Sequence, residues 1–285
     1  MIAADLPPAG SGPPAAVTDL ELYLLLEAVQ RISGHDFREY APAMLRRRVL
    51  ERVRAESVAT ISGLQERVIH QPGAMERLVD ALTFNPSAPF ADPAFFSELL
   101  EHVLPRLRTF PYVRVWFAGC GAGDDAYGLA ILCREANFDE RVRIYATDAA
   151  ATAVERARAG SVSRDEVEEI QRRYARSGGN GRVDAYFETA GAGLRYAESL
   201  RRSIVFAQHN LATDGSFNEF HLIVVRHALG KYNRVLVYHA HQVLYESLVR
   251  LGFLALGTKE TLRFTPHQKA YDAVAGTRDF FRRIR

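Results

Sequence analysis

The sequence contains little of what marks several large classes of protein. Its 285 residues include two cysteines, Cys120 and Cys133, which are too few for a disulfide framework and lack metal-ligand spacing. A net charge of +2 argues against the broad basic surface of nucleic-acid-binding domains. No uninterrupted apolar run approaches the roughly 18 residues of a membrane span, and the N-terminus lacks the basic and apolar regions of a signal peptide. We therefore expect a cytoplasmic protein with no nucleic-acid partner, no membrane insertion and no metal.

The composition, 48% hydrophobic and 25% charged, is that of a chain that can bury one large core or two smaller ones. Residues 1–18 are rich in proline, glycine and alanine and predict a disordered leader. Residues 19–92 show helical periodicity broken by Ser-Gly, Pro-Gly and Pro signals, which predicts a small helical domain and the start of a linker.

Residues 93–285 form the remaining domain, in which the pattern changes after Pro111 to short β-rich runs separated by helical stretches. The runs are YVRVWFAG, RVRIYATD, SIVFAQHN, FHLIVVRHAL and GFLALGTKE. This alternation predicts an α/β fold with a mostly parallel, doubly wound sheet. The polar, arginine-rich interval at residues 161–202 is too long for a simple connection and predicts an inserted subdomain.

A glycine-rich turn follows the first β-rich run, in the stretch VWFAGCGAGDDAYGLA. It holds Gly119, Gly121 and Gly123. Glycine permits positive φ and close approach of the backbone to a ligand at the carboxyl end of a parallel strand. The spacing departs from the dinucleotide fingerprint, and Asp124 and Asp125 in the first turn of the following helix would repel a diphosphate.

An acidic residue ends the next β-rich run, RVRIYATD, at Asp148. A carboxylate in this position can accept hydrogen bonds from the two hydroxyls of a ribose. Together with the glycine turn it predicts a nucleoside ligand without a phosphate, and the cationic S-adenosylmethionine would tolerate the neighbouring aspartates. The alternative is a tight turn with a surface aspartate at a strand end.

Several blocks in the same order resemble the CheR family of chemotaxis receptor methyltransferases. They are VWFAGCGAGDDAYGLA, IYATDAAATAVERARAG, HNLA, FHLIVVRHALGKYN and GFLALGTKE, preceded by the similar N-terminal segments ISGHDFREYAPAMLRRRVLERVRA and LTFNPSAPFADPAFFSELLEHVLP. The resemblance implies a helical N-terminal domain and a class I (Rossmann-like) S-adenosylmethionine methyltransferase domain that carries a small inserted β-subdomain. Members of the family transfer a methyl group to receptor glutamate side chains.

The resemblance also implies the residues that bind S-adenosylmethionine or its product S-adenosylhomocysteine. Matched position by position, they are Asn85, Ser87, Gly119, Gly121, Gly123, Asp124, Asp148, Asn210 and Leu211.

The catalytic positions of the family are less well matched. The arginine of the family's linker motif N-x-T-x-F-F-R falls on Ala91, and the tyrosine of R-N-V-x-I-Y-F falls on Lys231, with Tyr232 one residue later. Arg226 keeps the motif's first position. The resemblance therefore implies Lys231, Tyr232 and Arg226 as candidate catalytic residues. An arginine can hold a carboxylate with two charged hydrogen bonds, an alanine cannot, and a lysine orients it less well.

Two functions follow from these substitutions. By lineage the chain is a protein-glutamate O-methyltransferase acting on chemoreceptors, with a divergent and weakened active site. The alternative is a pseudoenzyme, which binds S-adenosylmethionine or another ligand and acts in signalling through its partners.

Five arginines crowd the predicted helix that begins near Pro42. They are Arg46, Arg47, Arg48, Arg52 and Arg54, with few acids between them. Like charges at this spacing repel one another, so we expect this helix to dock an acidic helical surface, such as a chemoreceptor or another signalling protein. The alternative is a solvated basic face.

Overall fold

The computed structural model describes residues 15–83 and 88–285. The chain divides into two compact units, Met1–Leu82 and Thr83–Arg285. Asn85 and Ser87, two of the expected cofactor residues, lie outside the described residues. Among the described helices, none combines the length and the apolar character needed to cross a bilayer.

The first unit is built from helices. They are α1 (Ala15–Ser33), α2 (Pro42–Ala55), α3 (Ile61–His70) and α4 (Ala74–Thr83). Proline occupies the start of α2, where a missing N–H costs nothing, and the side chain of Thr60 accepts a hydrogen bond from Gly63 at the start of α3. Apolar side chains at helical spacing, including Leu25, Val49 and Leu64, are fully buried.

The arginines of α2 are mostly engaged within their own unit. Ion pairs join Arg46 to Asp19, Arg47 to Glu51 and Arg52 to Glu56. Arg48 donates to the carbonyl oxygens of Ala81 and Leu82, at 3.1 and 2.8 Å. These four arginines therefore have partners within the unit: Glu51 and Glu56 lie one helical turn away, and Asp19 and the two carbonyls are distant in sequence. The docking role of the helix stays a proposal.

Glu56, buried at the end of α2, connects three arginines of the first unit. Its carboxylate pairs with Arg77 at 2.8 Å, with Arg67 at 3.4 Å and with Arg52. Hydrogen bonds from Arg77 and then Arg52 lower the pKa of Glu56 to about 2, against the opposing effect of desolvation. This carboxylate links α2, α3 and α4.

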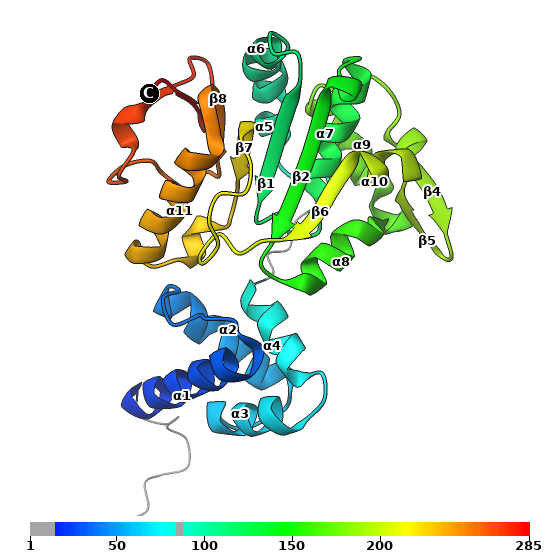
Figure 1. The fold of residues 1–285 in the computed structure, drawn as a ribbon. Helices are drawn as coiled ribbons and strands as arrows, with labels where there is room; N and C mark the ends of the chain where they lie inside the picture. Colours follow the sequence, from blue (N-terminus) through cyan, green and yellow to red (C-terminus); the bar gives the residue numbers. More distant parts are fainter. Residues whose placement is uncertain (1–14, 84–87) are drawn as a thin grey trace, which may run out of the picture. The chain divides into compact units, whose positions relative to one another are not determined.

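The second unit contains a seven-stranded sheet in the order β6-β2-β1-β7-β8-β10-β9 (Figure 1). The strands are β1 (Val113–Ala118), β2 (Val142–Asp148), β6 (Ile204–Gln208), β7 (Phe220–Val225), β8 (Leu248–Leu256), β9 (Tyr271–Ala273) and β10 (Phe280–Arg283). Strands β6, β2, β1, β7 and β8 pair in parallel, whereas β10 pairs antiparallel with β8 and β9. The expected α/β fold with a mostly parallel sheet is confirmed, and all five predicted β-rich runs contain strands.

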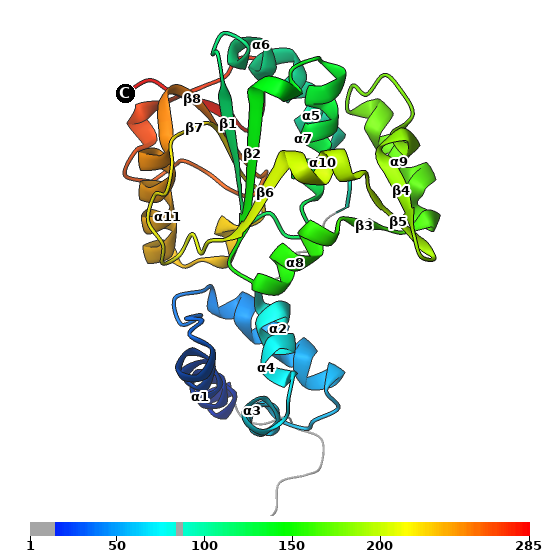
Figure 2. The ribbon, with the colours of Figure 1, turned by 45° about the vertical axis from the view of Figure 1, so that its right-hand side comes forward.

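Helices flank this sheet, as both ribbon views show (Figure 2). They are α5 (Pro93–Glu98), α6 (Leu104–Leu107), α7 (Asp124–Glu135), α8 (Ala151–Ala159), α10 (Glu198–Ser203) and α11 (Arg234–Ser247), with a π-helical turn at Leu99–Val103 between α5 and α6. Helix α9 (Val167–Arg176) lies beside the small strands β4 (Phe187–Ala190) and β5 (Gly193–Tyr196) instead. Alternate residues of β1 serve two cores. Phe117 packs in the core with α7, while Trp116 packs in the core with α11.

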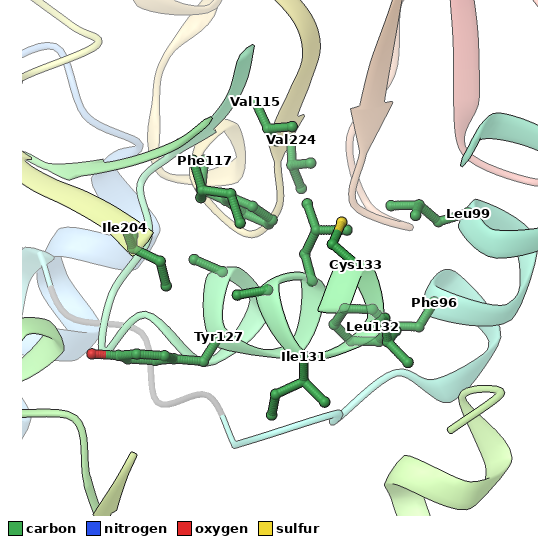
Figure 3. Close-up of a cluster of buried hydrophobic side chains, with 14 of the residues drawn as sticks. Phe96, Leu99, Val115, Phe117, Tyr127, Ile131, Leu132, Cys133, Ile204 and Val224 are labelled. Carbon is green, nitrogen blue, oxygen red and sulfur yellow. The ribbon is translucent and has the colours of Figure 1, made fainter. Parts of the chain in front are cut away.

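The core around α7 is wholly apolar in its centre (Figure 3). Phe117 of β1 and Val224 of β7 lie on the side of α7 that carries Cys133, whereas Ile131 points away from them, and all four side chains are buried. Gly128 lets this helix approach α5, because a Cβ there would lie 2.8 Å from the ring of Phe96. The packing fixes the start of α7, and with it the glycine turn, relative to the sheet.

A small antiparallel sheet lies in the interval where an insertion is predicted. Its order is β3-β5-β4, with β3 at Ser161–Val162, β4 at Phe187–Ala190 and β5 at Gly193–Tyr196. The hydroxyls of Tyr174 and Tyr186 both donate to Glu135 at the end of α7. The predicted inserted β-subdomain is confirmed, and these bonds attach it to the main domain.

Candidate functional site

The glycine turn follows the carboxyl end of β1, and its three glycines have a left-handed backbone conformation. Gly119, Gly121 and Gly123 have φ angles of +79°, +56° and +83°, values that glycine adopts without a Cβ clash. The N–H groups of Gly119 and Cys120 donate to the carbonyl oxygen of Thr147 at 2.8 and 2.9 Å. A Cβ at Gly119 would lie 2.8 Å from Ala228. The turn is therefore specified by glycine and fixed to β2.

Asp148 occupies the end of β2, next to that turn. Its Oδ2 accepts the N–H of Gly121 at 3.0 Å, and its Oδ1 accepts the N–H of Ala150 at 3.1 Å. The residue is 7% exposed. Each carboxylate oxygen has a second lone pair for another donor, so Asp148 can both hold the turn and accept hydrogen bonds from a ligand.

A pocket opens between the ends of β1, β2 and β7, and we call it the glycine-turn pocket. Its cavity volume is about 40 Å³, and the space around it is partly open to solvent. Its lining is Phe117, Ala118, Gly119, Cys120, Gly121, Asp125, Asp148, Val224, Arg226, His227 and Lys231. The pocket therefore combines an apolar floor with carboxylates and cations.

Arg226, at the end of β7, is held by two carboxylates. Its Nη2 lies 2.8 Å from Oδ2 of Asp92, and its Nη1 lies 3.0 Å from Oδ2 of Asp125. The guanidinium also stacks over the ring of Phe95, 4.3 Å from its centroid. The side chain is 8% exposed. Its charge is thus already compensated within the domain.

The other candidate catalytic positions are separated by the fold. Lys231 lines the glycine-turn pocket. Tyr232 lines a neighbouring hollow instead and packs against the core around α11. Ala91 is exposed, and its N–H donates to the carbonyl of Ala88.

The expected adenine-side residues follow β6. The side-chain oxygen of Asn210 accepts the N–H of Ala212 at 3.0 Å and so closes a local turn. Leu211 is buried in the core around α11. The same loop is joined to β2, because the N–H of His209 donates to the carbonyl of Asp148 at 3.1 Å. Neither Asn210 nor Leu211 is among the lining residues of the glycine-turn pocket.

The two acids of the first turn of α7 have different surroundings. Asp124, which the sequence comparison selects, is 8% exposed, and its charge adds to the effect of burial in raising the pKa of the Tyr127 and Tyr196 hydroxyls. Asp125 lines the pocket and pairs with Arg226. Sequence reasoning missed Asp125 as a site residue, although its place beside Asp124 marks it as a candidate.

His227 is a second pocket residue that sequence reasoning missed. It has a φ of +62°, which is uncommon for a residue with a Cβ. The turn around it is held by Glu260, whose carboxylate accepts the N–H of Leu229 at 2.8 Å and that of Gly257 at 2.7 Å. Burial raises the pKa of Glu260.

Cys120 also lines the pocket, and its surroundings make it a poor nucleophile. Burial, and then the charge of Asp148, raise the pKa of its thiol. A thiol, unlike a thiolate, reacts slowly. Cys120 therefore contributes surface rather than reactivity.

The residues of the pocket fit an adenosine-bearing cation. The bare backbone of the glycine turn permits close approach, and Asp148 offers acceptors for ribose hydroxyls. Counted together, Asp92, Asp125 and Asp148 outnumber Arg226 and Lys231, so the charges around the pocket favour a positive group. A diphosphate would be repelled by the same acids.

Comparison with known proteins agrees with this geometry. The family description "CheR methyltransferase, SAM binding domain" matches residues 85–279, and "CheR methyltransferase, all-alpha domain" matches residues 20–83. The protein Cher3 of Pseudomonas putida is 38% identical over 93% of this chain and 97% of its own. The chemotaxis protein methyltransferase of Listeria innocua is 28% identical over 86% of this chain and 92% of its own, and chemotaxis protein methyltransferase 1 of Pseudomonas aeruginosa is 27% identical over 88% and 93%.

Proposed function

This chain belongs to the CheR methyltransferase family, and on that premise we propose that it binds S-adenosylmethionine and methylates chemoreceptor glutamates only weakly. The glycine turn and Asp148 support the cofactor half of this proposal. In the half that would hold an acceptor carboxylate, Ala91 replaces one cation of the family. The other cation, Arg226, is already neutralised by Asp92 and Asp125.

The bound cofactor would supply an electrophilic methyl group on a sulfonium. Asp148 would accept hydrogen bonds from the ribose, as its remaining lone pairs allow. The glycine turn would allow the ligand to approach the backbone closely. Asp125 would stabilise the positive charge of the cofactor.

The observation that carries the proposal is the double pairing of Arg226. Methyl transfer to a carboxylate depends on holding the acceptor oxygen in line with the methyl group. An arginine whose Nη1 and Nη2 are already bonded to Asp125 and Asp92 is poorly placed to clamp a third carboxylate. Ala91 stands at the position of the family's linker arginine, and its side chain carries no charge.

The charges around the pocket also support the second candidate, a regulatory protein without methyltransferase activity. Asp125 and Asp148 line the pocket with Arg226 and Lys231, and Asp92 adds a further carboxylate to Arg226. An approaching glutamate would meet carboxylates that repel it, whereas a cationic cofactor would not. A protein that binds the cofactor without turnover would then act through its partners.

Two measurements on the purified chain test these statements separately. Calorimetric titration with S-adenosylhomocysteine tests the cofactor site, and we expect saturable one-to-one binding. Transfer of label from S-adenosylmethionine to chemoreceptor cytoplasmic fragments tests the chemistry, and we expect weak or no labelling. Rapid multiple turnover would contradict the weakened site, and an absence of cofactor binding would contradict both candidates.

A further inference from the structure

A second hollow lies beside the glycine-turn pocket in the same unit. It is formed by the start of α11 and by the loop that follows β8. Lys231 lines the glycine-turn pocket and the adjacent Tyr232 lines the hollow, so the two spaces are neighbours. The hollow has a volume of about 460 Å³ and is partly open to solvent, and this volume is within the range of small-molecule sites. We call it the arginine hollow.

The charged side chains that line the arginine hollow are all basic. Arg234 and Arg263 contribute to the lining, and among the described residues that form it none is an aspartate or a glutamate. Within residues 15–83 and 88–285, neither arginine forms an ion pair. The acid of the loop after β8, Glu260, instead accepts two backbone N–H groups. Two neighbouring positive charges without a carboxylate favour the binding of an anion.

Aromatic rings supply large flat surfaces beside these charges. Tyr232, Tyr238 and Phe264 all line the hollow. Arg234 and Tyr238 lie one turn apart on α11, and the guanidinium is 5.8 Å from the centroid of the tyrosine ring. Phe264 is 80% exposed, so most of its ring is accessible to a ligand.

The loop after β8 holds Phe264 in an uncommon backbone conformation. Its φ is +63°, which bulky residues rarely adopt. The N–H of Phe264 donates to the side chain of Gln268 at 3.0 Å, and the N–H of Arg263 donates to the hydroxyl of Thr261 at 3.0 Å. Backbone outliers of this kind concentrate where a protein holds a ligand. The loop thus presents an arginine and an aromatic ring side by side.

We propose that the arginine hollow binds a nucleotide. Its base would stack on the ring of Phe264, and its phosphate would be held by Arg234 and Arg263. A phosphate monoester carries a charge of about −2 at neutral pH, which matches the two guanidinium groups. The inference concerns a second ligand, so it depends neither on cofactor binding nor on methyl transfer.

The charges of the two neighbouring spaces favour different ligands. In the glycine-turn pocket, the carboxylates of Asp125 and Asp148 would repel a phosphate. The arginines of the hollow would attract a phosphate and would repel the sulfonium of S-adenosylmethionine. We therefore expect a nucleotide and S-adenosylhomocysteine to bind without displacing each other.

The test uses the full chain and the fluorescent nucleotide ethenoadenosine monophosphate, whose emission is quenched when its base stacks on a ring. Adenosine monophosphate, adenosine and a single-stranded oligoadenylate are the competing probes. Arg234→Gln with Arg263→Gln removes the cations. Arg47→Gln with Arg54→Gln is the matched control, because it removes the same charge from α2 in the other unit. Phe264→Leu removes the ring but keeps an apolar side chain, and Phe264→Tyr keeps the ring. Circular dichroism of every variant checks the fold.

We expect saturable binding of the fluorescent nucleotide, which adenosine monophosphate should displace at least about tenfold better than adenosine does. The double change of Arg234 and Arg263 should weaken binding about tenfold or more, and Phe264→Leu about fivefold or more. Phe264→Tyr and the α2 control should each change it by less than about twofold. Saturating S-adenosylhomocysteine should leave the nucleotide bound.

The proposal is overturned if the nucleotide does not bind, if S-adenosylhomocysteine displaces it, or if the α2 control weakens binding as much as the double change in the hollow. It is also overturned if adenosine competes as well as adenosine monophosphate, because the arginines would then have no role. Binding of the oligoadenylate more than about tenfold more tightly than the mononucleotide would overturn it in favour of nucleic acid.

Discussion

The guanidinium of Arg226 and the carboxylate of Asp125 lie 3.0 Å apart in the lining of the glycine-turn pocket, although 101 positions separate them in the chain. Asp92 approaches the same guanidinium from the other side at 2.8 Å. The pairing joins the end of β7 to the start of α7 and to the beginning of α5. Arg226 therefore positions Asp125 and has little capacity left to hold a substrate carboxylate.

Replacing Arg226 by methionine should destabilise the second unit. The change leaves Asp125 without its cation and Asp92 with the more distant, half-exposed Arg278, at a cost of about 3 kcal/mol in the free energy of unfolding. The measurement is urea denaturation. Arg278→Met is the control, because Arg278 is half exposed and its pairs contribute less than about 1 kcal/mol. Adding Asp125→Asn to Arg226→Met should recover part of the loss, and equal effects of the two methionine variants would contradict the assignment.

Asp148→Asn should weaken the binding of S-adenosylhomocysteine. The neutral amide removes the charge and one acceptor, so we expect a loss of about 1 to 3 kcal/mol, or about 5- to 150-fold in Kd. Calorimetry gives the value directly. Asp184→Asn, an exposed acid of the inserted subdomain, is the control and should leave Kd unchanged. An unaltered Kd in Asp148→Asn would mean that the ligand does not contact this carboxylate.

Glu56 makes the first unit sensitive to acid. Its pKa is lowered from 4.5 to about 2 in the folded state, so between these values the unfolded chain binds more protons. The stabilisation is complete above pH 4.5 and is lost as the pH falls toward 2. Glu56→Gln should cost about 1 to 3 kcal/mol at neutral pH and flatten the dependence on pH in this window, as measured by denaturation followed with circular dichroism. A variant with the same acid profile as the unmodified chain would show that the arginine cluster is not what protects this unit.

The sequence predicts the elements of this fold where one physical signal dominates. Apolar β-rich runs locate β1 and β2, and the glycines locate the turn, because the left-handed backbone excludes other residues there. Strands β9 and β10 were not predicted. They are three and four residues long and carry charged residues, such as Arg282 and Arg283. Their stability comes from pairing, of β10 with β8 and of β9 with β10, rather than from local pattern.

The charge pairing in the two units was beyond sequence reasoning for a different reason. Arg46 and Asp19 lie 27 positions apart, and Arg226 and Asp92 lie 134 apart. The folded backbone decides which charged groups come within reach of a long side chain. A run of arginines in the sequence therefore does not reveal which of them stay unpaired. The same limit hid the pairing of Asp125 with Arg226.

Single-turnover methyl transfer with saturating S-adenosylmethionine tests the central claim most directly. The acceptor is a chemoreceptor cytoplasmic fragment, and the unmodified chain is compared with Ala91→Arg plus Lys231→Tyr. Ala91→Gln plus Lys231→Tyr is the matched control, which adds length without charge. We predict slow or undetectable transfer by the unmodified chain, and a rise of at least about tenfold in the arginine variant alone, because a carboxylate clamp is restored. Fast transfer by the unmodified chain, not increased by the arginine, would contradict the account.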